Sequence, residues 1–179
     1  MTRGFHAWHD LSPGDNVPNE VQVFIEIPKG SRNKYELDKE TGLIKFDRLL
    51  YSSVHYPGDY GFIPQTLADD DDPLDVVVIT TEATFPGCIM KVRPIGVFEM
   101  RDKGMDEKVL CVPLADPLRT NYRSLKDVRP HYLKEVEHFF AIYKELEGGV
   151  TELLGWQDVD YAHKVINDCL QRYQSVKPK

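Results

Sequence analysis

ADDDDPLDVVV, residues 68–78, places five carboxylates directly before an apolar β-branched run. Residues 69–72 are all aspartate, Pro73 fixes the backbone after them, and Asp75 opens the run at 76–79. That run is typical of a buried strand. Neighbouring carboxylates repel one another, so each raises the cost of ionising the next. Carboxylates at the mouth of a core strand need a counter-charge, and a hard divalent cation supplies it in the smallest space.

Two interpretations of this acidic turn are open from the run alone. It is either a solvated surface turn or a D-x-D-P-x-D metal cluster made by Asp70, Asp72 and Asp75. A calcium loop of the EF-hand type fits poorly. Counting from Asp70, that loop needs glycine where Asp75 stands and glutamate where Thr81 stands.

The composition predicts a globular chain with a sizeable core. It has 179 residues, 41% hydrophobic and 28% charged, which suits a single domain over 1–179. The net charge of −7 argues against nucleic acid as the main partner and is consistent with binding cations. No apolar run approaches a membrane span, and MTRGFHAWHD at 1–10 lacks an apolar signal core. Cys88, Cys111 and Cys169 lack metal-ligand spacing, so we expect reduced thiols and a cytoplasmic protein.

Strands are expected through most of the chain. Residues 1–19 are rich in Gly, Pro, Asp and Asn and predict an irregular arm. The turn KETG at 39–42 predicts a hairpin, and Pro94 predicts a bend in a long strand. The expected strands are residues 21–28, 34–38, 43–46, 76–79, 88–100 and 108–114.

Helical spacing begins after Ala115. Pro130 suits a first helical turn, and Gly148-Gly149 predicts where this helix stops. A second amphipathic helix follows, with Asp158 or Asp160 as its cap. The apolar positions that recur are Leu133, Val136, Phe140 and Tyr143 in the first helix, and Ala162, Val165, Ile166, Cys169, Leu170 and Tyr173 in the second. Strands followed by helices predict an α+β fold: a small closed, highly twisted antiparallel β-barrel, OB-like, with two C-terminal helices.

Acidic, basic and phenolic side chains fall on strand ends and on the loops that follow. Phosphoryl transfer needs such a mixture, because carboxylates hold Mg²⁺ while metals and cationic side chains neutralise phosphate oxygens. The acids are Glu26, Glu36, Asp70, Asp72, Asp75, Asp102 and Asp106; the bases are Lys34, Arg48, Lys108 and Lys144; the phenols are Tyr56, Tyr60 and Tyr143.

These motifs, taken in order, resemble the soluble family I inorganic pyrophosphatases of the short bacterial type. The resemblance covers nearly the whole chain, from EIP at 26–28 to the second helix. The matching segments are Lys34-Tyr35-Glu36, Asp47-Arg48, Tyr56-Pro57, Asp59-Tyr60-Gly61, the hexapeptide that begins at Asp70, Arg93-Pro94, HFF at 138–140 and Tyr143-Lys144.

The resemblance implies hydrolysis of inorganic pyrophosphate to two phosphates by direct in-line attack of a metal-bound hydroxide. It implies several Mg²⁺ ions, for which Mn²⁺ or other divalent ions can substitute. The implied metal ligands are Asp70, Asp75 and Asp106 for the first ion, with Asp102, Glu36 and Glu26 serving further ions. Asp72 is the implied general base, acting with Tyr60, Lys34 and Arg48. The implied phosphate-binding residues are Lys34, Arg48, Tyr60, Lys108, Tyr143 and Lys144, with Tyr56 behind them.

Two departures from the family pattern stand out. The loop from Asp102 to Asp106 is one residue shorter than in some relatives, so Glu107 competes with Asp106 for alignment on the family's D-x-K. Gly148 and Val150 stand where several relatives carry lysine. The resemblance also implies a homohexamer built as a dimer of trimers, and the apolar stripe of the first helix is either its interface or core.

A second function class is a barrel-type binding protein for nucleic acid or another phosphorylated ligand, the usual role of OB-like barrels. The net charge of −7 and the acidic turn argue against it, because both repel polyanions unless metals intervene. The sequence therefore favours a metal-dependent pyrophosphatase without membrane or nucleic-acid partners.

Overall fold

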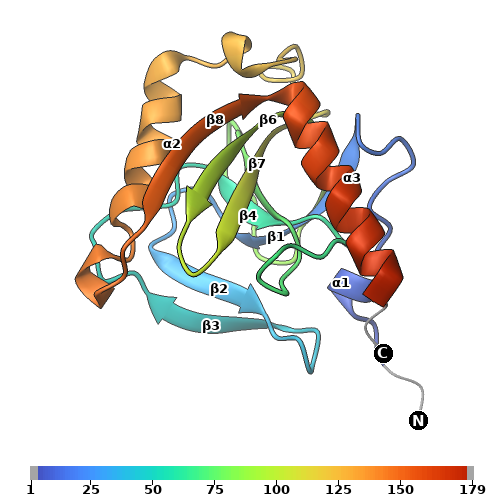
Figure 1. The fold of residues 1–179 in the computed structure, drawn as a ribbon, viewed down its shortest axis with the longest axis horizontal. Coiled ribbons are helices and arrows are strands. Elements are labelled where there is room, and N and C mark those ends of the chain that lie inside the picture. Colours follow the sequence, from blue (N-terminus) through green and yellow to red (C-terminus); the bar gives the residue numbers. More distant parts are fainter. Residues whose placement is uncertain (1–3, 177–179) are drawn as a thin grey trace.

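A twisted ring of strands flanked by two long helices makes up the protein in a computed structural model that describes residues 4–176 (Figure 1). The strand order is β1-β4-β5-β7-β6-β8, and an additional pairing of β1 with β6 closes the ring. β2 and β3 form a separate hairpin. The bounds are β1 Val21–Ile27, β2 Asn33–Leu37, β3 Ile44–Leu49, β4 Asp59–Phe62, β5 Asp75–Val78, β6 Ile89–Arg101, β7 Met105–Pro113 and β8 Glu152–Asp158.

The six expected strands are confirmed and precede the two long helices, but a further strand, β8, lies between these two helices in the chain. The long strand β6 shifts its register between Pro94 and Gly96, as the proline predicts. One pairing departs from the antiparallel expectation, because β5 and β7 run parallel. This parallel register sets Asp75 directly beside Lys108, which are far apart in sequence.

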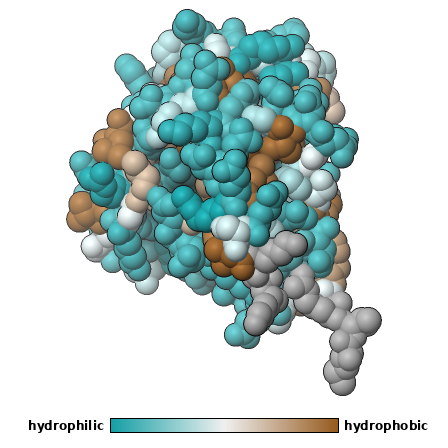
Figure 2. Space-filling view, turned by 45° about the vertical axis from the view of Figure 1, so that its right-hand side comes forward, coloured by the Kyte–Doolittle hydropathy of each residue, from teal (hydrophilic) through white to brown (hydrophobic). Residues whose placement is uncertain are grey.

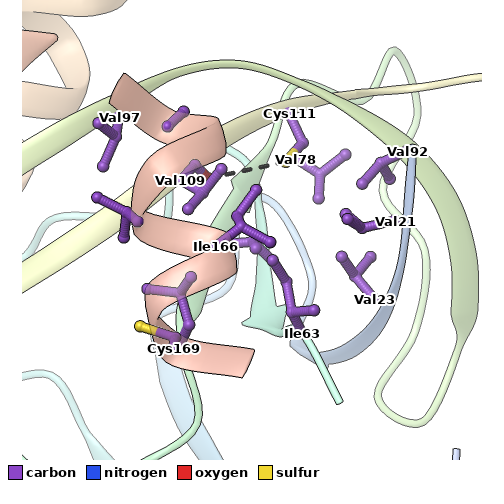
Figure 3. Packing of buried hydrophobic residues seen from close by; sticks show 14 of the residues in the cluster. Val21, Val23, Ile63, Val78, Val92, Val97, Val109, Cys111, Ile166 and Cys169 are labelled. Carbon is purple, nitrogen blue, oxygen red and sulfur yellow. Dashed lines mark hydrogen bonds between the residues drawn. The ribbon is translucent and has the colours of Figure 1, made fainter. Parts of the chain in front are cut away.

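Strand alternation sends the side chains of and just after β5 into two different apolar clusters. Val76 and Val78 point into one cluster, while Val77 and Ile79 point into the other. The first cluster is covered by α3 (Val159–Val176), and Figure 3 shows Ile166 of that helix among the valines of the strands. The second is covered by α2 (Pro130–Ile142), so the two helices close different faces of the ring.

The helices begin near their predicted starts, but α2 ends earlier than expected. It stops at Ile142, a short 3-10 helix (Glu145–Glu147) follows, and Gly148 then adopts a left-handed conformation. The apolar stripe of α2 is core, since Val136, Phe139 and Phe140 are buried. Another 3-10 helix (Leu125–Asp127) precedes α2, and the Asp158 carboxylate accepts the Val159 N–H at the start of α3. Among residues 4–176, no helix is long and apolar enough to cross a membrane.

The N-terminal arm is more ordered than the sequence predicts. It contains a single helical turn, α1 (Ala7–Asp10), and its Ala7 and Trp8 are buried. They cover an aromatic pair, Phe24 and Phe62, that projects from neighbouring strands β1 and β4. The expectation of an irregular arm was therefore wrong for this turn, because burial of Trp8 stabilises a helix too short to persist alone.

The strand β4 was not expected from the sequence, because its segment is dominated by glycine, proline and tyrosine. Its Gly61 faces Ile25 across the pairing with β1. A Cβ atom there would lie 1.9 Å from the backbone oxygen of Phe24, so only glycine allows this approach. The close contact brings the neighbouring Tyr60 to the mouth of the ring.

Candidate active site

A cavity of about 450 Å³ opens where the β2–β3 hairpin, the mouth of the ring and the end of α2 meet. Carboxylates, lysines and phenols dominate its wall. A second cavity of about 260 Å³ adjoins it, and both are lined by Lys34, Glu36, Tyr60, Asp72 and Asp75. The predicted site residues that line the first cavity are Lys34, Glu36, Tyr56, Tyr60, Asp70, Asp72, Asp75, Asp102, Asp106, Lys108, Tyr143 and Lys144.

Lys108 forms the centre of the charge arrangement. Its side chain is only 4% exposed, and its ammonium forms ion pairs with Asp75 and with Asp106, the latter at 2.5 Å. Burial opposes the lysine charge, but these carboxylates outweigh it and hold the pKa of Lys108 above its ordinary value. Burial also raises the pKa of Asp75, although Lys108 opposes that effect and the Tyr60 hydroxyl donates to the Asp75 carboxylate.

The acidic turn is held by its own backbone. The Ala68 N–H donates to the Asp72 carbonyl at 2.7 Å, and the Asp72 N–H donates to the Asp70 carboxylate at 3.1 Å. Asp71 takes a left-handed backbone conformation with φ 65°, which turns the chain between them. Burial is the main cause that raises the pKa of Asp70. Asp70 and Asp72 both line the larger cavity, so the turn is not a solvated surface feature alone.

Two predicted residues lie outside the larger cavity. Glu26 lines the adjoining one, where burial raises its pKa to about 8 and its carboxylate accepts the Leu37 N–H at 2.7 Å. Arg48 lines neither cavity. Arg48 of β3 lies opposite Lys34 of β2 in the strand register. Its guanidinium contacts the Glu147 carboxylate at 2.8 Å.

The opposite wall comes from the loop after β6 and the end of α2. The Lys144 ammonium contacts the Asp102 carboxylate at 2.5 Å, and Asp102 and the neighbouring Tyr143 raise the pKa of this lysine against the effect of burial. Tyr56 packs its ring 5.4 Å from that of Tyr60, and burial keeps the pKa of both phenols well above the ordinary value. Both phenols therefore remain hydrogen-bond donors at neutral pH.

Alternation along β7 separates Asp106 from Glu107. Asp106 lines the cavity beside Lys108, whereas Glu107 lies opposite Glu99 and interacts with Arg172 of α3. Burial is the main cause that raises the pKa of Glu107 to about 7. Of the two alternatives left open by the sequence, Asp106 is the one placed with the other carboxylates.

The donor chemistry of the cavity fits hard divalent cations. All its acids are aspartate or glutamate, the oxygen ligands that Mg²⁺ prefers. Within residues 4–176, however, no three His, Cys, Asp or Glu side chains converge closely enough to hold one ion. Lys108 lies between Asp75 and Asp106 and supplies positive charge to both carboxylates.

Comparison with known proteins agrees with this combination of fold and site. The family model described as inorganic pyrophosphatase matches residues 23–174. The chain belongs to the inorganic pyrophosphatase family.

Relatives of this pyrophosphatase family cover almost the entire chain. The inorganic pyrophosphatase of Synechocystis sp. is 54% identical over 92% of this chain and 99% of its own length. That of Methanosarcina acetivorans is 55% identical over 89% and 96%. The crystal structure of inorganic pyrophosphatase from Thermus thermophilus superposes with a TM-score of 0.91 at 41% identity, covering 94% of this chain and 99% of that one. The likeness confirms the expected OB-like α+β fold class.

Some residues at the site were not singled out from the sequence. Lys39 and Trp8 line the smaller cavity. Neither residue lies in a segment that matches the family pattern, so the sequence did not mark them as site residues. Trp8 lies in the arm, Lys39 in a hairpin turn, and only tertiary packing brings them to the acidic turn.

Proposed function

We propose that the protein hydrolyses inorganic pyrophosphate to two phosphates in the larger cavity, with the whole chain acting as one domain. The observation that carries this is the lysine–carboxylate arrangement around Lys108, buried at the wall of a cavity that also holds Tyr60 and Lys144. Such a site can bind a small, highly charged anion only together with cations. Pyrophosphate with a divalent metal meets both needs.

In this proposal the carboxylates hold the metal and the basic residues hold the substrate. The first ion would be held by Asp70, Asp75 and Asp106. Further ions would be served by Asp102, Glu36 and Glu26. The phosphate oxygens would be bound by Lys34, Arg48, Tyr60, Lys108, Tyr143 and Lys144. Bound Mg²⁺ would neutralise phosphate charge and polarise the attacking water. Asp72 would accept the proton of that water as general base. Arg48 must turn from Glu147 to reach the substrate, since it lies outside the cavity.

The direct test is phosphate release. Purified protein is incubated with pyrophosphate and Mg²⁺, and orthophosphate is measured colorimetrically against a sample containing excess chelator. We expect release only in the sample with free Mg²⁺. Absence of release with Mg²⁺ would overturn the proposal and leave a barrel-type binding protein as the alternative.

Calcium is expected to bind without supporting turnover. Mg²⁺ takes compact octahedral geometry at about 2.0–2.1 Å, whereas Ca²⁺ coordinates loosely at about 2.3–2.6 Å and polarises water less. Activity should therefore fall as Ca²⁺ displaces Mg²⁺ at constant total metal, while Mn²⁺ should replace Mg²⁺ at least in part. Full activity with Ca²⁺ as the only divalent ion would contradict this expectation.

We retain a homohexamer built as a dimer of trimers as the proposed assembly. The stripe of α2 no longer supports it, because that stripe is core. Support comes from the family and from apolar side chains that stay exposed on and after β3: Phe46, Leu49 and Tyr51. Figure 2 shows one face of the molecule on which hydrophobic residues form small separate groups. Sedimentation at micromolar concentration should give the hexamer, and a monomer there would rule it out.

The cytoplasm is the proposed compartment. All three cysteines are free thiols, and Cys111 and Cys169 are buried. Unpaired thiols are typical of a reducing compartment.

A further inference from the structure

Lys39 connects the N-terminal arm to the acidic turn. It stands in the turn between β2 and β3, and its ammonium forms an ion pair with the Asp72 carboxylate. Both side chains line the smaller cavity together with Asp75 and Tyr60. Asp72 is the proposed general base, so the ion pair with Lys39 can set the orientation of the carboxylate that accepts the proton.

The lysine is held by more than this ion pair. Its ammonium lies over the ring of Trp8 at 5.8 Å from the centroid, within cation–π distance. Its backbone carbonyl lies 3.2 Å from the Nε2 of His6, which is buried. Its ammonium also lies 3.5 Å from the carbonyl of Asp71. The arm therefore fixes both the backbone and the side chain of Lys39.

Trp8 is itself anchored to the segment that carries the acidic turn. Its indole N–H donates to the Thr66 carbonyl at 2.8 Å, and its own carbonyl accepts the Gln65 N–H at 2.9 Å. The Thr66 hydroxyl in turn accepts the Leu74 N–H at 2.8 Å, just after the acidic turn. One indole thus contacts the acidic-turn segment on one side and Lys39 on the other.

We propose that Lys39 is a positioning residue for Asp72 and that Trp8 acts through Lys39, so that the N-terminal arm forms part of the active-site wall. This inference rests on the proposed function. Lys39 contacts the proposed base rather than the substrate, so replacing Lys39 should lower kcat and leave KM nearly unchanged. It adds little to stability, because the side chains of Lys39 and Asp72 are 54% and 48% exposed and exposed ion pairs contribute little.

The first part of the test uses Lys39→Met, which keeps the aliphatic stem, and Lys39→Arg, which keeps the charge. Mutating a residue that orients a metal ligand typically costs about 10–100-fold in metal affinity or activity. For the half-exposed contact between Lys39 and Asp72 we expect the lower end of that range, so the kcat of Lys39→Met should fall about tenfold. KM for pyrophosphate should change less than about twofold, since substrate binding is retained. Lys39→Arg should recover most of the turnover. Lys91→Met, at an exposed lysine away from both cavities, is the matched control.

The second part is a double-mutant cycle. Trp8→Phe keeps the packing and loses the indole N–H, and Trp8→Leu removes the aromatic face; chemical denaturation is followed in parallel. If Trp8 acts through Lys39, the kcat of Trp8→Leu combined with Lys39→Met should equal that of Lys39→Met alone. Trp8→Phe, which keeps an aromatic face over Lys39, should retain near-wild-type kcat. Should Trp8→Leu fail to fold, the cycle between Lys39→Met and Asp72→Asn remains the test of the positioning role. In the Asp72→Asn background, Lys39→Met should cause no further loss.

Three results would overturn the inference while leaving the proposed function intact: unchanged kcat in Lys39→Met, a rise in KM alone, or additive losses in the cycle with Trp8 or with Asp72. A wild-type protein that releases no phosphate would instead overturn the proposed function, and this inference with it.

Discussion

Asp72→Asn is expected to lower turnover about 10²–10⁴-fold, the range for loss of a general base. Asparagine keeps the shape of the side chain and its place in the turn but cannot accept the proton of the attacking water. The position favours this role over metal ligation. Both residues line the two cavities, but the Asp72 side chain is 48% exposed, whereas that of Asp75 is 24% exposed and pairs with the buried Lys108. Asp72→Asn should also move the pH optimum alkaline, because hydroxide must then form without help.

The matched comparison is Asp75→Asn. It removes a proposed metal ligand whose charge faces the buried Lys108, so it should weaken Mg²⁺ binding more than Asp72→Asn does. Mg²⁺ affinity by titration calorimetry and pH–rate profiles would be measured for both variants. If Asp72→Asn loses metal affinity yet keeps near-normal turnover at saturating Mg²⁺, Asp72 is a ligand and another group is the base.

The sequence predicted most of the strands and nearly all of the cavity wall, for a physical reason. The polar outliers fall where strands end, and strands of one ring bring their ends to a common mouth. Asp75 illustrates the limit of that reasoning. Its position at the start of an apolar run predicted a counter-charge, but the parallel pairing that supplies Lys108 is a long-range contact without a local signal.

Other long-range contacts could not be predicted for the same reason. Glu147 was not expected near Arg48, because the sequence predicted that the first long helix runs to Gly148, whereas α2 ends at Ile142. The arm was expected to be irregular because its composition favours turns, yet Trp8 is 5% exposed and lines the smaller cavity. A large aromatic residue in a polar arm is the one signal that could have indicated docking.

Glu26→Gln is expected to stabilise the metal-free protein at alkaline pH. Burial raises the pKa of Glu26 to about 8 from an ordinary value of 4.5, so between these values the folded state keeps a proton that the unfolded state has lost. Stability from this group is therefore fully present below about pH 4.5 and is lost as pH rises toward 8. Glutamine mimics the neutral form throughout, and its oxygen can still accept the Leu37 N–H.

The expected difference between Glu26→Gln and wild type is small at pH 4.5 and grows to about 3–5 kcal/mol in the free energy of unfolding at pH 9, from 1.36 kcal/mol per pKa unit. Chelator-treated protein is used, because a bound cation would favour the ionised carboxylate of wild type. Urea denaturation at both pH values measures the difference, and Glu40→Gln in the exposed hairpin turn is the control. A difference that is equal at both pH values, or wild type more stable at pH 9, would show that Glu26 ionises in the folded protein without this cost.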